Sequence, residues 1–135
     1  MKKLSIALVG IALSVSAQAD VVLVGNPAAA ELSQTNASKL FLGKMKTLPW
    51  GGKPKLIELQ DGNPLRLEFH QKVTGKTEAQ LKSYWSRLVF TGKAAAPSQV
   101  TSAAQVKQQV AGNSAAVGYI DQADVDDSVK VLLTP

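Results

Sequence analysis

Short apolar runs, each the length of one strand and separated by segments with helical spacing, most constrain what this chain can fold into. The first run, Val21–Val24, is continuous and stops at Gly25, which is typical of a buried strand. Residues 55–59 have the alternation of a second strand, and apolar stretches at 115–120 and 129–133 predict two more. The sequence therefore predicts the order β-α-β-α-α-α-β-β in a layered α/β or α+β domain with at least one right-handed crossover. Residues 93–100, KAAAPSQV, are expected to be a linker.

Helix starts can be read from capping residues. Ser33, Asn63, Thr77 and Ser102 each stand before a helical pattern, and such side chains accept a hydrogen bond from a free N–H of the first turn. Pro64 follows Asn63 at the first helical position, where the missing N–H of proline is harmless. The helix after Thr77 is the clearest, because its apolar residues recur at i, i+3, i+4 and i+7: Leu81, Tyr84, Trp85 and Leu88.

The first 19 residues have the pattern of a secretory signal peptide. Residues 1–3 (MKK) are a basic start, residues 4–15 are almost entirely apolar, and residues 17–19 (AQA) fit a signal-peptidase site. The apolar run is shorter than the roughly 20 residues of a membrane-spanning helix, although a retained N-terminal anchor is the alternative. We therefore expect a signal peptide over residues 1–19 and one exported domain over residues 20–135. The bacterial periplasm is the expected destination, with no membrane span after cleavage.

Composition limits the class of this domain. Residues 20–135 suffice for one domain with its own core and are too few for two. The chain has no cysteine, which excludes disulfides, thiolate metal sites and a thiol nucleophile. Removal of Lys2 and Lys3 lowers the formal charge from +5 to +3. This mild excess, with scattered basic residues and few aromatics, is not the pattern of a nucleic-acid-binding protein.

The segment QDGNPLRLEF, residues 60–69, suggests an anion-binding corner. A glycine turn leads into the Asn63-Pro64 helix start, and Arg66 lies in the first helical turn. Backbone N–H groups at a helix N-terminus, together with a guanidinium, are a common way to hold an oxyanion. An ordinary helix start with an exposed arginine is the alternative interpretation.

Three segments resemble a known family. LFLGKMKTLPW (40–50), YWSRLVFTGKAAAP (84–97) and AAVGYI (115–120) are similar, in this order, to the periplasmic phosphate-binding proteins of ABC importers. The resemblance covers most of residues 21–133 and is greatest for short members with one lobe. It implies an α/β fold, namely a single three-layer lobe of a type 2 periplasmic-binding protein, and a role in phosphate uptake or sensing. Complete members have two lobes that close on the anion, whereas this chain has room for about one.

The resemblance also implies which residues would bind the anion. The corresponding loop of the family reads Arg-x-x-x-Gly-Ser-Gly-Thr-Arg-x-x-Phe, and its hydroxyl and backbone N–H groups hold phosphate. We align the two segments at Arg66 and Phe69. The anion-binding residues that follow from this alignment are Gly62, Asn63, Leu65 and Arg66.

The same alignment predicts a weakened site. Asn63 and Leu65 replace the serine and threonine of the family, so both hydroxyl donors are lost. Pro64 replaces the second glycine and removes one N–H, and Asp61 would repel a dianion. On one open lobe, where water screens charge interactions, we expect millimolar phosphate binding or none.

Other polar groups do not form a catalytic or metal-binding set. His70 is the only histidine, so no Ser-His-Asp triad is supported, and a satisfied or exposed helix histidine is expected. Trp85 is expected in the core rather than in a sugar-stacking platform with Trp50. The spacing of the acidic cluster is not that of an EF-hand calcium site, so a solvated turn is expected. The cluster consists of Asp121, Asp124, Asp126 and Asp127. No cofactor and no enzymatic activity are predicted.

Two functional hypotheses remain open. The first is recognition of a small oxyanion, phosphate above all, with tight binding requiring a second wall from another copy of the chain or from another protein. The second is a periplasmic protein-interaction module that kept the lobe and lost the ligand. Retention of Arg66 and of the helix start favours the first, and loss of both loop hydroxyls favours the second.

Overall fold

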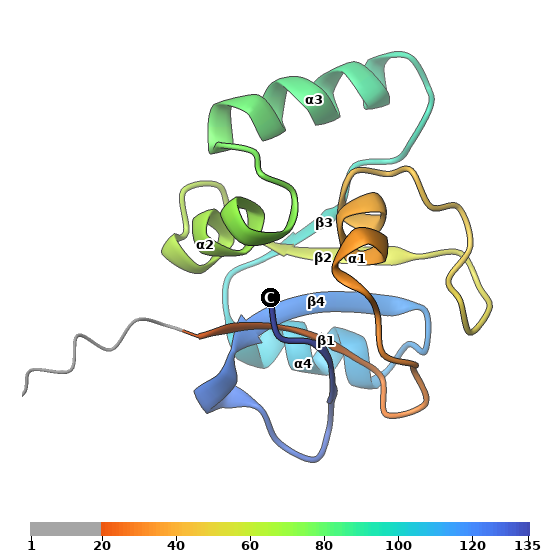
Figure 1. The fold of residues 1–135 in the computed structure, drawn as a ribbon, viewed down its shortest axis with the longest axis vertical. Helices are drawn as coiled ribbons and strands as arrows, with labels where there is room; N and C mark the ends of the chain where they lie inside the picture. The colour runs from red at the N-terminus through yellow and green to blue at the C-terminus, as the bar shows by residue number, and fades with distance from the viewer. Residues whose placement is uncertain (1–19) are drawn as a thin grey trace, which may run out of the picture.

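A five-stranded sheet with helices on both faces forms the body of the protein (Figure 1). The computed structural model describes residues 20–135, so the expected signal peptide lies outside the described residues. The elements are β1 (Val21–Gly25), α1 (Gln34–Phe41), β2 (Lys55–Leu59), α2 (Pro64–Val73), α3 (Glu78–Phe90), β3 (Ser98–Val100), α4 (Ala103–Ala111), β4 (Ala116–Asp121), the short 3-10 helix η1 (Gln122–Asp124) and β5 (Lys130–Leu133). Within residues 20–135, no helix is long and apolar enough to cross a membrane.

The sheet is mixed, with the strand order β3-β2-β4-β1-β5. Strand β2 runs parallel to β3 and β4, whereas β1 runs antiparallel to β4 and β5. All five residues of β1 are buried. Because β1 has a strand on each side and is covered on both faces, its sequence is a continuous apolar run instead of an alternating one.

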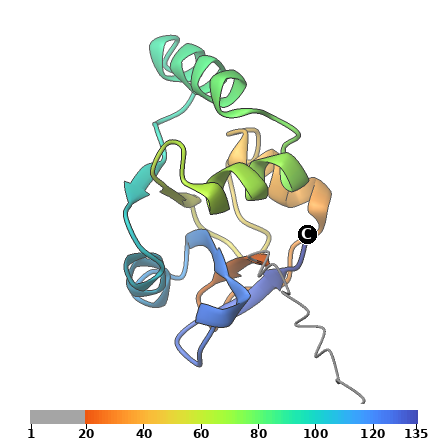
Figure 2. The same ribbon diagram turned by 90° about the vertical axis from the view of Figure 1, so that its left-hand side faces the viewer.

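Helices cover the two faces of this sheet (Figure 2). On one face, the ring of Tyr119 in β4 stacks on Phe69 of α2 with centroids 4.2 Å apart. The preceding residue, Gly118, faces α4, where an added Cβ would lie 2.8 Å from Cγ1 of Val106. A glycine is therefore required inside β4 for α4 to approach the sheet this closely. The predicted three-layer α/β lobe is confirmed.

Helix α3 stands away from the sheet, beyond α1 and α2 (Figures 1 and 2). Only Leu81 and Trp85 of its residues are buried. Two side-chain hydrogen bonds fasten it to the end of α1: the Tyr84 hydroxyl donates to the carbonyl of Leu42, and the Trp85 indole N–H donates to the carbonyl of Phe41. The expected burial of Trp85 is confirmed.

The predicted helix starts are also confirmed. The side chains of Ser33, Asn63, Thr77 and Ser102 each accept a hydrogen bond from a backbone N–H of the following first turn. At Thr77 the capping box is complete, because the side chain of Gln80 accepts from the Thr77 N–H in return. Each cap satisfies a donor that the helix itself leaves unpaired.

One element was assigned wrongly from the sequence. Residues 93–100 were expected to be a linker, but residues 98–100 form the edge strand β3, which pairs in parallel with residues 57–59 of β2. The strand is three residues long and mostly exposed, so it carries no apolar pattern. Its strand conformation comes from pairing with a distant segment, which local sequence does not encode.

Candidate functional site

The predicted anion corner lies where β2 leads into α2. The turn at residues 60–63 brings Gly62 to a φ of +78°, a conformation that glycine adopts without strain. Asn63 then caps α2 by accepting from the N–H of Leu65 at 2.9 Å, and its own N–H donates to the carbonyl of Gln60 at 3.1 Å. Two of the four predicted residues, Asn63 and Leu65, are thus joined to each other in the helix cap.

Arg66, the cationic residue of the corner, is buried and fully partnered. Its side chain is 6% exposed. Nη1 donates to Oε2 of Glu58 at 3.0 Å and to the carbonyl of Leu59 at 3.2 Å, while Nε donates to the carboxylate of Glu78 at 3.0 and 3.1 Å. Burial is the largest influence and disfavours the guanidinium cation, but the interactions with Glu58, Tyr119 and Glu78 together outweigh it, so the pKa of Arg66 is raised.

Glu78, at the first position of α3, occupies the point where the donors of the corner converge. Its Oε1 accepts from the N–H of Gly62 at 2.6 Å and from Nε of Arg66 at 3.0 Å. A backbone N–H and a guanidinium N–H aimed at one anionic oxygen are the elements of an oxyanion site. Here the anionic oxygen comes from the chain itself.

Glu58 lies behind the corner in the core. It is 1% exposed and accepts from Arg66 and from Nε2 of His70 at 2.9 Å. The Tyr119 hydroxyl accepts from the Leu59 N–H at 3.1 Å; burial and the Glu58 charge raise the pKa of Tyr119. The other ring nitrogen of His70 is 3.0 Å from the Thr74 hydroxyl, which confirms the expectation of a satisfied helix histidine.

Asp61 adds a third carboxylate at the solvent side of the corner. It accepts from the side chain of Gln99 in β3 at 2.8 Å and lies 3.1 Å from Nζ of Lys82 in α3. These two hydrogen bonds lower the pKa of Asp61. The corner therefore holds two cations, Arg66 and Lys82, against the three carboxylates of Glu58, Asp61 and Glu78, a balance that opposes entry of a dianion.

A cavity of about 510 Å³ adjoins the corner. Arg66, Glu58 and Asp61 line one side, and α3 lines the other with an apolar wall that includes Trp85 and Phe90. The wall opposite the corner is thus partly supplied by α3 of the same lobe. The corner is less open than the length of the chain led us to expect.

Sequence reasoning missed the two carboxylates that bind Arg66. Glu78 lies 12 residues away from Arg66 and was not singled out from the sequence. Glu58 was not singled out either; it lies within the predicted strand at residues 55–59. The sequence did contain a signal for an acidic partner. Arg66 and His70 are four residues apart on α2 and therefore lie on the same helix face. If that face is buried, both polar side chains need hydrogen-bond acceptors, which a carboxylate would provide.

Two members of the acidic cluster near the C-terminus, Asp121 and Asp126, have hydrogen-bond partners. Asp121 caps η1 by accepting from the Ala123 N–H, and Asp126 pairs with Lys107 at 2.8 Å. The hydrogen bonds from Lys107 and Ser128 lower the pKa of Asp126. Among residues 20–135, no three His, Asp or Glu side chains are grouped to hold a metal ion.

Comparison with known proteins identifies the fold. No protein-family model and no curated protein sequence matches the chain. Among solved structures, an ABC-type phosphate transport receptor from Vibrio cholerae superposes with a TM-score of 0.64 at 18% identity, covering 84% of this chain and 45% of the receptor. A protein described as a phosphate ABC transporter substrate-binding protein, from Clostridium perfringens with bound phosphate, gives 0.64 at 21% identity, covering 84% of this chain and 44% of that one.

PstS from Borrelia burgdorferi is similar to the same extent, with a TM-score of 0.62 and 15% identity over 84% of this chain and 46% of PstS. The chain thus spans less than half the length of these receptors. At this level of identity the likeness concerns the fold alone. The protein has the fold of part of a phosphate ABC transporter substrate-binding protein.

Proposed function

We propose that the protein recognises a small oxyanion, phosphate above all, at Gly62, Asn63, Leu65 and Arg66, and that Glu78 fills this site when no ligand is bound. The observation that carries the proposal is the convergence of the Gly62 N–H and Arg66 Nε on one oxygen of Glu78, at 2.6 and 3.0 Å. A corner that satisfies a carboxylate oxygen in this way also suits a phosphate oxygen.

Ligand binding in this arrangement is an exchange of one anion for another. Phosphate must displace the Glu78 side chain and tolerate Glu58 and Asp61 nearby. Because the new contacts replace existing ones, the net gain is small and we expect a dissociation constant in the millimolar range for the isolated chain, about 4 kcal/mol of binding free energy.

The cellular setting that we propose follows from the N-terminal sequence. Residues 1–19 direct export and are removed, and residues 20–135 act in the periplasm in phosphate uptake or sensing. The similarity of the fold to phosphate transport receptors supports this role. A second copy of the chain or another periplasmic protein would cover the open side of the cavity beside α3.

Thermal unfolding of residues 20–135 with increasing phosphate tests the proposal, with sulfate and chloride at matched ionic strength as references. Glu78→Gln removes the competing charge, so we expect phosphate to raise the melting temperature of this variant at about tenfold lower concentration than in the wild type. The matched control is Glu68→Gln, which makes the same charge change at the Lys72 ion pair on the surface of α2. A response equal for all three anions in every variant would overturn the proposal.

A second candidate function, a protein-interaction module without ligand, is favoured by the exposed end of α3. Phe90 is 92% exposed and Val89 is 45% exposed, beside the cavity that adjoins the corner. Exposed aromatic side chains next to a cavity are typical anchors for a partner protein. If phosphate stabilises neither the wild type nor Glu78→Gln, this candidate replaces the first.

A further inference from the structure

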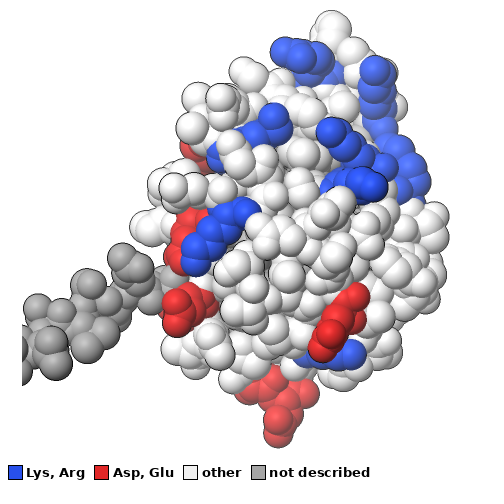
Figure 3. Space-filling model, in the orientation of Figure 1, with Lys and Arg blue, Asp and Glu red and all other residues white. Residues whose placement is uncertain are grey.

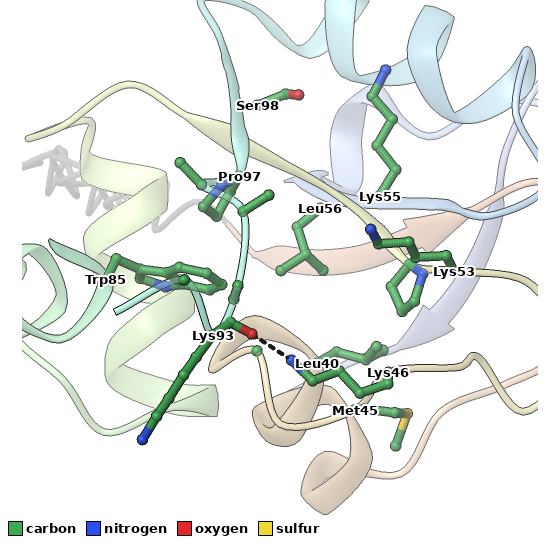
Figure 4. Close-up of a pocket in the computed structure, with 16 residues that line it drawn as sticks. Leu40, Met45, Lys46, Lys53, Lys55, Leu56, Trp85, Lys93, Pro97 and Ser98 are labelled. Carbon is green, nitrogen blue, oxygen red and sulfur yellow. Dashed lines mark hydrogen bonds between the residues drawn. The ribbon is translucent and has the colours of Figure 1, made fainter. Parts of the chain in front are cut away.

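A second cavity lies across segment 92–98 from the one at the corner. Its volume is about 620 Å³, within the usual range for small-molecule sites. Apolar side chains form much of its lining, including Leu40 of α1, Met45 in the loop after α1, Leu56 of β2 and Trp85 of α3 (Figure 4). The residues proposed to bind phosphate, Gly62, Asn63, Leu65 and Arg66, do not line this cavity. The two cavities share Trp85, Ala96 and Pro97.

The charged groups around this cavity are all cationic. Figure 4 shows the amino groups of Lys46 and Lys53 turned toward the space beside Leu56, whereas the side chains of Lys55 and Lys93 extend away from it. Nζ of Lys46 donates to the carbonyl of Lys93 at 2.8 Å, which fixes its position. The ammonium group of Lys53 makes no hydrogen bond or ion pair with any part of residues 20–135 that the structure describes.

No carboxylate compensates these lysines. Asp and Glu are absent from the lining, and the sequence has none at residues 32–57 or 79–120, the ranges from which the lining comes. In Figure 3, Lys and Arg gather over α3 and the loop after α1, whereas Asp and Glu gather toward the opposite end of the molecule. The cavity therefore combines an apolar interior with an uncompensated positive rim.

We propose that this cavity binds a small organic anion with an apolar body, such as a medium-chain carboxylate. The apolar part would lie against Leu56 and Trp85, and the carboxylate would accept hydrogen bonds from Lys53 and Lys46. Apolar pockets with a few placed polar groups are the usual form of small-ligand sites. The ammonium groups favour a negatively charged ligand, and the apolar lining favours an organic anion over a simple inorganic one. This site is separate from the oxyanion corner and does not depend on it.

Fluorescence of Trp85 gives a direct readout of binding. The chain has two tryptophans, so Trp50→Phe leaves Trp85 as the only one. Octanoate is the probe, with octanol as the apolar reference without charge and acetate as the charged reference without an apolar body. We expect a saturable change with octanoate at about 1 mM, a weaker one with octanol and none with acetate.

Two lysine variants in the Trp50→Phe background separate the cavity from general electrostatics. Lys53→Gln removes the ammonium that faces the space, and we expect octanoate affinity to fall about tenfold. Lys93→Gln makes the same charge change at the rim of the same cavity, with a side chain that points away, and we expect less than a twofold change. Equal effects of the two variants, equal affinity for octanoate and octanol, or binding of an acidic pentapeptide in place of octanoate would overturn the proposal.

Discussion

At the scale of single residues, Arg66 and Glu58 form an ion pair almost wholly withdrawn from water, with side chains 6% and 1% exposed. Burying such a pair costs desolvation energy, and the pair is stable because Leu59, Glu78 and His70 complete its hydrogen bonds. Removal of one partner leaves the other charge buried without compensation. The pair therefore matters for folding whether or not the corner binds a ligand.

Arg66→Ala should lower the free energy of unfolding by about 3–5 kcal/mol, because Glu58 then stays buried without a cation. The measurement is urea denaturation followed by circular dichroism. Glu68→Gln, which breaks the exposed pair with Lys72, should cost no more than about 0.5 kcal/mol. A loss below about 1 kcal/mol for Arg66→Ala would show that water reaches Glu58 and that the ion pair is not buried in solution.

Tyr119 should make the fold sensitive to alkaline pH. Burial and Glu58 raise the pKa of its phenol, so above the unfolded pKa of about 10 the unfolded state ionises first and stability falls as the pH rises. The stability difference between wild type and Tyr119→Phe should change by about 1 kcal/mol between pH 10 and 11, to the disadvantage of the wild type. Parallel pH profiles for the two proteins would contradict this account.

The residue scale also shows where sequence reasoning stopped. Asn63, Pro64 and Arg66 could be placed because a helix start is a local pattern. The partner of Arg66 could not be placed, since Glu78 reaches it only after the chain has passed through α2 and turned back into α3. Contacts between separate elements decide whether an arginine is free or already engaged.

At the scale of elements, α3 differs from the other helices by its few attachments. It buries only Leu81 and Trp85 and is tied to α1 by the side chains of Tyr84 and Trp85. The caps of this helix were predictable from sequence, and so was its apolar stripe. Its position away from the sheet was not, because the same stripe would also suit a helix packed directly on the sheet.

Backbone amides of α3 should exchange with deuterium much faster than those of β1 and β4, because elements with few buried contacts open locally without global unfolding. Tyr84→Phe removes the bond to the Leu42 carbonyl and should speed exchange in α3 further. The amides of β4 serve as the internal control and should be unaffected. Uniform exchange across α3 and β4 in the wild type would mean that the helix unfolds only with the sheet.

Buried strands could be predicted from the sequence, whereas the exposed edge strand could not. Strands β1, β2 and β4 were recognisable because their apolar runs are buried by the fold. The edge strand β3 is exposed and short, so the sequence predicts a linker there. Its pairing with β2 could be found only from the position of β2 in the finished sheet.

At the scale of the whole molecule, residues 20–135 form a five-stranded sheet with a helix layer on each face. They do so although the chain spans less than half the length of the receptors with the same fold. We expect this segment to fold alone in one cooperative transition, with a heat capacity change of about 1.4–1.7 kcal/mol/K. Differential scanning calorimetry and far-ultraviolet circular dichroism should report the same midpoint. Separate midpoints would indicate that one layer is incomplete without another chain.

Glu78 connects the starts of two helices. It is the first residue of α3, and its carboxylate accepts a hydrogen bond from Gly62 in the turn before α2. A ligand that displaced this carboxylate would remove the hydrogen bonds that join the start of α3 to Gly62 and Arg66. Occupancy of the corner would then be transmitted to the most weakly anchored helix and to the aromatic side chain at its far end, Phe90. If the corner binds an anion as proposed, ligand binding would thereby alter the surface that α3 offers to a partner.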